Sequence, residues 1–229
     1  MRNRPTNKPP GATTRSDASR DTDLRIIGGH FRGRRLHYHG DPIVRPMKHR
    51  VREAIFNLIS TESAGRHAID LFAGTGALGL EALSRGAEQA TFIERHVPSA
   101  QVLAENIAAL GVVSHTTLLV TSAFLWAKRD LPTMVADRAA AQLPWLVFCS
   151  PPYDFFVDRR QDMLALIDSL KKCSPPGSTL VVEADERFDF QPLIDDNNWT
   201  WDVRVYPPAV VAIGRFFRTL NSNGVNDVD

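Results

Sequence analysis

The chain has 229 residues, a formal net charge of +1, and 43% hydrophobic residues. This length suits one α/β domain with a sizeable core and some appendages, and the composition is ordinary for a globular protein. Two cysteines predict neither a disulfide framework nor a metal cluster, no apolar run has the length of a membrane span, and the polar N-terminus is unlike a signal peptide. We therefore expect a cytoplasmic monomer that binds no metal.

The charge is unevenly distributed along the sequence. Residues 1–66 contain 14 basic and 6 acidic residues, a net charge of +8, whereas residues 67–229 have a net charge of −7. A basic front end on an acidic body favours a polyanionic partner, although a merely solvated basic face has the same composition.

The N-terminal part divides into a tail and a basic extension. Residues 1–23 are polar with almost nothing to bury, which predicts a disordered tail. Residues 24–38 alternate basic, aromatic and glycine positions, which predicts a β-hairpin suited to RNA. A helix with one apolar face is expected from about 47 to 59. In this extension, residues 24–60, the predicted RNA contacts are Arg25, Arg32, Arg34, Arg35, Arg45, Lys48, Arg50 and Arg52.

The centre of the sequence predicts a buried strand at 67–72, a glycine turn, and a helix that ends at Gly86. Gly74 and Gly76 permit a tight turn that a ligand can approach, and Gly79 lets the helix lie close to the sheet. The spacing of these three glycines also matches the dinucleotide fingerprint. A nucleotide-linked oxidoreductase and a bare structural turn are therefore alternative interpretations.

Asp70 favours a cationic cofactor at this turn. A carboxylate would repel a pyrophosphate but attract the sulfonium and ammonium groups of S-adenosylmethionine (SAM), although helix capping or simple solvation would also explain it. Glu94 ends the next expected strand, 90–94, where its carboxylate can accept hydrogen bonds from two ribose hydroxyls. The predicted cofactor site comprises Asp70, Phe72, Ala73, Gly74, Thr75, Gly76, Glu94, Arg95, Ser122 and Ala123.

The rest of the chain alternates strands and helices, which predicts one doubly wound sheet. Helices are expected at 98–110 and 158–172, an Ala- and charge-rich insertion at 128–144, and a frayed tail at 221–229. The remaining expected strands are 116–120, 145–149, 178–183, 200–206 and 209–217.

A second motif, Ser150-Pro151-Pro152-Tyr153, directly follows the strand expected at 145–149. The two prolines stiffen the turn, so that the Pro151 carbonyl and the Ser150 hydroxyl can accept both hydrogens of an exocyclic amino group. That arrangement directs the nitrogen lone pair at a methyl group, while Tyr153 stacks on an extruded base. We predict all four residues to be catalytic; a rigid structural turn is the alternative.

Together these motifs resemble the SAM-dependent amino-methyltransferases and, more narrowly, the RsmD family. Besides the glycine turn and the Ser150–Tyr153 motif, the resemblance rests on residues 25–29, 33–36, 45–46, 50–53, 56–57 and 76–86. RsmD enzymes methylate the N2 amino group of one guanine in 16S ribosomal RNA. The resemblance implies a Rossmann-like class I methyltransferase domain at 61–220, with a mostly parallel seven-stranded sheet covered by helices on both faces. It also implies SAM as cofactor and ribosomal RNA or the small ribosomal subunit as partner.

The chain departs from the family pattern in three ways. Ser150 stands where the family usually has Asp or Asn, and Ser122 where an acidic residue often follows the third strand. Met47 and Lys48 replace a usual Thr-Thr or Thr-Ser pair. Adenine-N6 or cytosine-N4 methylation of nucleic acid, and a catalytically silent RNA-binding assembly factor, are the alternative functions.

Overall fold

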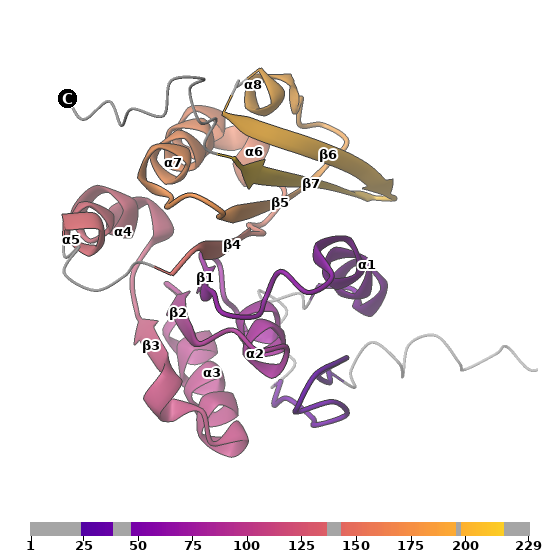
Figure 1. Cartoon of the computed structure of the whole chain (residues 1–229), viewed down its shortest axis with the longest axis vertical. Helices are drawn as coiled ribbons and strands as arrows, with labels where there is room; N and C mark the ends of the chain where they lie inside the picture. Colours follow the sequence, from indigo (N-terminus) through magenta and orange to yellow (C-terminus); the bar gives the residue numbers. More distant parts are fainter. Residues whose placement is uncertain (1–23, 39–46, 137–142, 196–197, 218–229) are drawn as a thin grey trace, which may run out of the picture.

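A seven-stranded sheet lies at the centre of the protein, with the strand order β3-β2-β1-β4-β5-β7-β6 (Figure 1). The computed structural model describes residues 24–38, 47–136, 143–195 and 198–217, so the predicted tails at 1–23 and 221–229 and Arg45 lie outside the described residues. The strands are β1 (His67–Asp70), β2 (Gln89–Ile93), β3 (Thr116–Leu119), β4 (Trp145–Cys149), β5 (Thr179–Asp185), β6 (Trp199–Tyr206) and β7 (Ala209–Phe216).

The first five strands run parallel, and β7 pairs antiparallel with both β5 and β6. Every residue of β4 is buried, which explains its continuous apolar sequence: a central parallel strand is covered on both faces. Leu146 and Phe148 belong to the hydrophobic cluster on one face, and Val147 belongs to the cluster on the other. The predicted doubly wound, mostly parallel sheet is confirmed.

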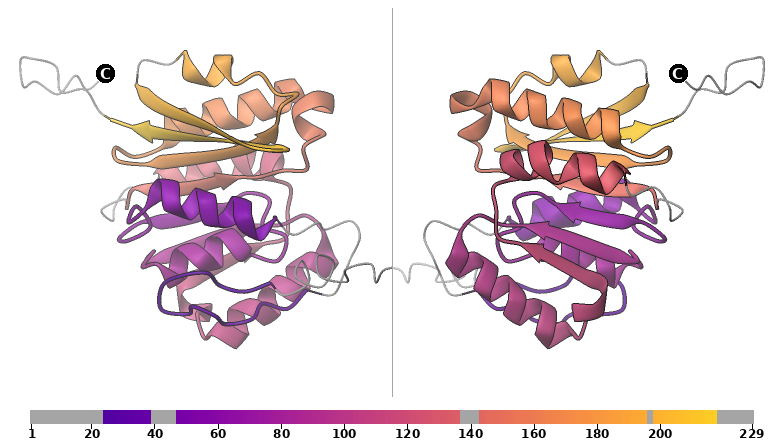
Figure 2. Two further views of the ribbon diagram at one scale, coloured as in Figure 1. Left: turned by 90° about the vertical axis from the view of Figure 1, so that its right-hand side faces the viewer. Right: turned by 90° about the vertical axis from the view of Figure 1, so that its left-hand side faces the viewer.

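Helices cover both faces, as the two views of Figure 2 show with α1 and α2 in front of the sheet on the left and α4 and α7 in front on the right. The first face holds α1 (His49–Ile59), α2 (Ala77–Ser84) and α3 (Val97–Leu110). The second face holds α4 (Ala123–Arg129), α5 (Leu131–Ala136), α6 (Phe155–Asp158), α7 (Arg160–Cys173) and α8 (Gln191–Ile194). A short 3-10 helix, Val113–His115, precedes β3.

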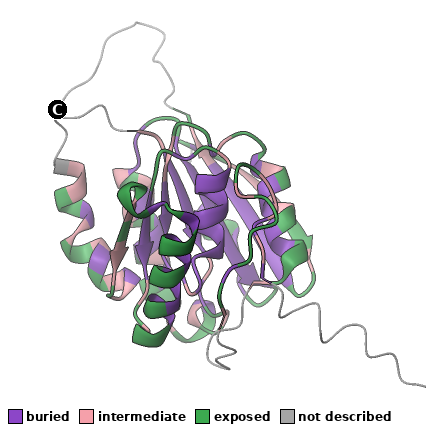
Figure 3. Ribbon diagram, turned by 90° about the horizontal axis from the view of Figure 1, so that it is seen from below, coloured by how far each residue is buried: buried purple, intermediate pink, exposed green. Residues whose placement is uncertain are grey.

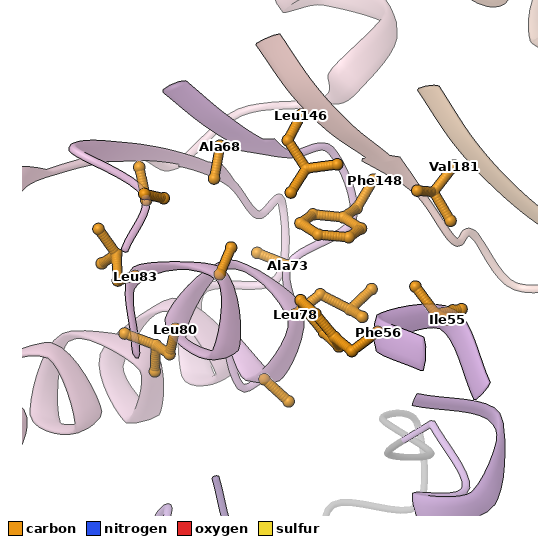
Figure 4. Close-up of a cluster of buried hydrophobic side chains, with 14 of the residues drawn as sticks. Ile55, Phe56, Ala68, Ala73, Leu78, Leu80, Leu83, Leu146, Phe148 and Val181 are labelled. Atoms are coloured by element: carbon orange, nitrogen blue, oxygen red, sulfur yellow. The ribbon is translucent and has the colours of Figure 1, made fainter. Parts of the chain in front are cut away.

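Side chains from both layers close the first face of the sheet. Central strands are buried and the outer faces of the helices are exposed (Figure 3). In Figure 4, Phe56 of α1 lies beside Phe148 of β4, with ring centroids 5.7 Å apart. A Cβ atom at Gly79 would lie 2.3 Å from the ring of Phe92 on β2, so only glycine lets α2 lie this close to the sheet. The role predicted for Gly79 is confirmed.

Some boundaries differ from the expected ones. The segment 24–38, called here the N-terminal hairpin, forms one isolated antiparallel bridge between Arg25 and Arg35 rather than two full strands. The first helix begins at His49, and β1 ends at Asp70 because the glycine turn begins there. Among the described residues, none of the helices combines the length and the apolar character needed to cross a membrane.

Candidate active site

The glycine turn joins β1 to α2 through backbone conformations that favour glycine. Gly74 and Gly76 have φ angles of +53° and +79°, and the Gly76 N–H donates to the Ala73 carbonyl at 2.7 Å. Gly76 is the N-cap residue of α2 and has no side chain to cap it. Asp70 supplies the cap from β1 instead: its Oδ2 accepts the N–H of Gly79 at 3.1 Å.

Asp70 is a buried carboxyl group, with 2% of its surface exposed. Burial, together with the nearby charge of Glu94, raises the pKa of Asp70 to about 7, although the hydrogen bonds from the backbone of Gly79 and Phe72 lower it. Helix capping, left open by the sequence, is therefore one role of this residue. Ionised Asp70 is also a buried negative charge, which a cationic ligand would stabilise.

Glu94, directly after β2, is a second carboxylate that binds the backbone of the glycine turn. Its Oε2 accepts the N–H of Gly74, and its Oε1 accepts the N–H of His96, both at 2.7 Å. The carboxylate therefore joins the glycine turn to the residues that follow β2. In this arrangement Glu94 keeps further acceptor capacity, because each carboxylate oxygen has two lone pairs.

Aromatic side chains lie beside this turn on the second face of the sheet. Phe72 contacts the rings of Phe124 and Phe155, with centroids 6.1 and 6.0 Å apart. Arg95 lies over Phe155 at 5.4 Å, and Arg159 lies over Phe124 at 3.9 Å. Phe124 and Phe155 are not predicted from the sequence, because their meeting depends on how α4 and α6 pack. Of the remaining predicted cofactor residues, Ser122 is the N-cap residue of α4 and Ala123 is buried.

Asn106 of α3 joins the glycine turn to the N-terminal hairpin. Its Nδ2 donates to the carbonyls of Thr75 and His37 at 3.0 and 3.1 Å, and its Oδ1 accepts the N–H of His37 at 2.6 Å. Asn106 is fully buried, and its bond to the Thr75 carbonyl is buried with it. One amide side chain therefore holds both the predicted cofactor loop and the predicted RNA-docking segment.

The Ser150–Tyr153 motif forms a corner after β4, and both its hydroxyl groups bind one carboxylate. Ser150 Oγ donates to Oε2 of Glu183, and the Tyr153 hydroxyl donates to Oε1 at 2.7 Å. Pro151 is buried and Pro152 is exposed. The sequence predicts Glu183 only as the end of a strand, with no role in the site. The register reveals its place, because Cys149 of β4 pairs with Val182 of β5, and the next residues along are Ser150 and Glu183.

Both predicted motifs lie at the same edge of the sheet. Asp70, the last residue of β1, is in register with Phe148 of the neighbouring parallel strand β4, and Ser150 follows two residues later. Carboxyl ends of adjacent parallel strands are where open α/β sheets bind ligands. In the described part of the chain, no three His, Cys, Asp or Glu side chains gather as metal ligands.

The N-terminal hairpin is held on α2 by two buried side chains. Both carboxylate oxygens of Glu81 accept backbone N–H groups, from Ile27 and Gly28, at 2.7 Å each. The Ser84 hydroxyl accepts the N–H of Phe31 and donates to the carbonyl of Gly28. The hairpin is therefore a fixed part of the first face, as Figure 1 shows beside α2.

Arg52 corrects one predicted RNA contact. The helical pattern places Arg52 on the outside of α1, but the residue is 1% exposed, and its Nη2 donates to the Arg25 carbonyl at 2.6 Å. Its Nε and Nη1 have no hydrogen-bond partner among the described residues. Burial lowers the pKa of Arg52, and the charge of Glu81 raises it. The prediction is wrong because the N-terminal hairpin covers this side of the helix.

The other predicted RNA contacts lie at the surface of the extension. Lys48 and Arg50 are exposed at the start of α1. Arg34 is exposed but donates to the carbonyl of Ala109, at 2.7 Å. The remaining described members of this set, partly buried or exposed, are Arg25, Arg32 and Arg35.

Comparison with known proteins identifies a matching family and several relatives of this chain. A family model described as "Conserved hypothetical protein 95" matches residues 24–203. Ribosomal RNA small subunit methyltransferase D of Haemophilus influenzae is 30% identical over 178 residues, which span 78% of this chain and 86% of that protein. The enzyme of the same name from Escherichia coli K12 is 48% identical over 87 residues, 38% of this chain and 44% of that protein.

A solved structure shows the same architecture. The Escherichia coli protein yhhF, whose name describes it as a methyltransferase, superposes with a TM-score of 0.65 at 27% identity and covers 85% of this chain and 98% of its own. The sheet order, the glycine turn and the match along most of the sequence agree with a class I methyltransferase fold. The chain therefore belongs to the RsmD family of ribosomal RNA methyltransferases.

Proposed function

We propose that this protein transfers the methyl group of SAM to the exocyclic N2 amino group of a guanine in small-subunit ribosomal RNA, acting in the cytoplasm as a monomer. One observation supports the proposal above the others: the Asp70 turn and the Ser150–Tyr153 corner follow neighbouring parallel strands at one edge of the sheet. The first suits a cationic cofactor and the second an amino group. Their proximity is what a transfer between the two requires.

The residues of the glycine turn fit SAM. Asp70 and Glu94 place two carboxylates beside the glycine turn, and their mutual repulsion contributes to the raised pKa of Asp70. A positively charged ligand would offset that repulsion, whereas a pyrophosphate would add to it. Glu94 would bind the ribose hydroxyls with its remaining lone pairs. Phe72, Arg95 and Ser122 would border the nucleoside.

When bound, SAM supplies a methyl group on a sulfonium, and its transfer to N2 releases one proton from the amino group. Ser150 Oγ and the Pro151 carbonyl would accept the two amino hydrogens and so turn the nitrogen lone pair toward the donor. Tyr153 would stack on the extruded guanine. Much of the rate enhancement then comes from placing the two reacting atoms in line and close together.

The N-terminal hairpin and α1 would dock the RNA. Lys48 and Arg50 present exposed positive charge at the start of α1, and Arg32 and Arg35 do so on the hairpin. Such side chains neutralise phosphates and position the RNA without reading its sequence. Because Glu81 fixes the hairpin to α2, the docking surface and the glycine turn share one rigid support.

The test is transfer of labelled methyl groups from SAM to small ribosomal subunits, to naked 16S RNA and to duplex DNA, followed by nucleoside mass spectrometry. We expect N2-methylguanosine at one mapped nucleotide of the ribosomal RNA. N6-methyladenosine or N4-methylcytidine instead would mean that the target base is adenine or cytosine. Label only in DNA would mean that ribosomal RNA is not the substrate. Tight RNA binding with no methyl transfer would identify a silent assembly factor. Calorimetry that detects NAD binding but no SAM binding would favour an oxidoreductase.

A further inference from the structure

Glu183 joins the two hydroxyl groups of the predicted base-handling corner. The residue lies on β5, between β4 and β7, and only 4% of its surface is exposed. Each of its carboxylate oxygens accepts one hydroxyl, Oε2 from Ser150 and Oε1 from Tyr153. The two halves of the corner are therefore connected through a residue that lies 30 positions after Tyr153 in the sequence.

The position of the hydroxyl protons follows from the chemistry of an ionised carboxylate. Because such a group only accepts hydrogen bonds, both protons must point toward Glu183. A serine hydroxyl has one proton and two lone pairs, so Ser150 Oγ presents only lone pairs to any other partner. The same carboxylate fixes the hydroxyl end of Tyr153 and therefore the direction in which its half-buried side chain points.

We propose that Glu183 is a positioning residue, which makes Ser150 a hydrogen-bond acceptor for the substrate amino group and holds Tyr153 in the orientation that stacks on the base. This inference rests on the proposed function and adds a residue to the same site. It also explains how a serine serves at this position, since a free hydroxyl can donate as readily as it accepts.

A structural role alone would be costly at this position. Burial raises the pKa of Glu183, so its charged form is held at an energetic cost that the hydrogen bonds from Ser150 and Tyr153 reduce. The other charged residue of β5, Asp185, is already paired: it binds Arg187 at 2.7 Å, and Arg187 also binds Asp154 at 2.9 Å. An apolar side chain would suit the interior of β5 better if the residue served packing only.

Glu183→Gln tests the proposal with little change of shape. An amide oxygen accepts but an amide nitrogen donates, so one of the two hydroxyls loses its acceptor. We expect kcat for RNA methylation to fall about 10- to 100-fold, with the Kd for SAM changed less than about twofold. The matched control is Glu186→Gln, an exposed glutamate three residues later. Equal losses of kcat in both variants, or a large loss of SAM affinity in Glu183→Gln, would overturn the proposal.

A double-mutant cycle separates positioning from packing. Leucine at position 183 offers neither hydroxyl an acceptor, so the Tyr153→Phe and Glu183→Leu variants share one lost interaction if Glu183 acts through Tyr153. The double variant is then about as active as Glu183→Leu alone. Multiplicative losses would mean that the two residues act independently and would contradict the proposal.

A readout without catalysis keeps this inference apart from the proposed function. The pKa of Tyr153 is raised by burial and by Glu183, well above its ordinary value. With 13Cζ-labelled tyrosine, NMR should show Tyr153, assigned through Tyr153→Phe, remaining un-ionised in the wild type at a pH where it begins to ionise in Glu183→Gln. Identical titrations would refute the contact. If the contact is present but no RNA is methylated, the proposed function fails instead.

Discussion

The two motifs at the carboxyl edge of the sheet are held in different ways. At the glycine turn, carboxylates of Asp70 and Glu94 accept backbone N–H groups, from Gly79 and from Gly74. At the corner after β4, the carboxylate of Glu183 accepts side-chain hydroxyls, from Ser150 and from Tyr153. Backbone donors are present whatever the neighbouring side chains are, whereas hydroxyl donors depend on the identity of particular residues. The glycine turn is thus held by bonds to the backbone, whereas the corner after β4 depends on the side chains of Ser150, Tyr153 and Glu183.

The largest effect expected from this comparison concerns Asp70 and pH. Because the pKa of Asp70 is raised to about 7 in the folded protein, its contribution to stability is complete below about pH 4 and is lost as the pH rises through 7. Asp70→Asn keeps an acceptor for Gly79 but does not ionise. The free energy of unfolding of the variant, minus that of the wild type, should therefore rise by about 3 to 4 kcal/mol between pH 4 and pH 8.

Denaturant unfolding at several pH values measures this difference. The same variant should bind SAM more weakly at pH 8, because the charge that attracts the cofactor is gone. If the free energies of unfolding of the two proteins change with pH in parallel, the pKa of Asp70 is not raised in the folded protein.

The second effect concerns the glycine turn, where carboxylates accept backbone N–H groups. Glu94→Ala removes the acceptor for Gly74 and His96 together with the predicted ribose contacts. We expect the Kd for SAM to rise at least about 100-fold, about 3 kcal/mol, as measured by calorimetry. Glu186→Ala, a change of an exposed carboxylate, should leave the Kd unchanged. Normal SAM binding by Glu94→Ala would mean that the turn does not need this carboxylate.

The third effect concerns the Ser150–Tyr153 corner, which is held by bonds between side chains. Tyr153→Ala removes the stacking ring but leaves the glycine turn intact, so it should reduce kcat about 10- to 100-fold with little change in the Kd for SAM. Rapid-quench kinetics and calorimetry measure the two quantities separately. Equal losses in rate and affinity would remove the distinction between the two halves of the site.

The smallest effect concerns the exposed basic residues. Lys48→Ala combined with Arg50→Ala should reduce the slope of log K against log salt for RNA binding by about 1.4, while the thermal midpoint stays the same. Binding titrations at a series of salt concentrations give the slope. Arg52→Ala is the contrasting variant, because this buried side chain should lower stability rather than the salt slope.

Much of the fold follows from local sequence patterns. The apolar run of β4 and the glycine spacing before α2 predict their elements within two residues, since burial on both faces and positive φ angles restrict the residue types. Arg52 shows the limit of periodicity, which gives the direction of a side chain around α1 but not what packs there. Glu183 shows a second limit: its partners are known only once β4 and β5 are in register.

The place of β7 between β5 and β6 has a consequence for synthesis of the protein. The edge of β5 that pairs with β7 stays open until residue 216 has been translated, although β5 itself ends at residue 185. A chain truncated before residue 209 would therefore present a bare strand edge at β5, which invites aggregation or capture by a chaperone. The pairing of β7 with the strand that bears Glu183 is therefore among the late events of co-translational folding.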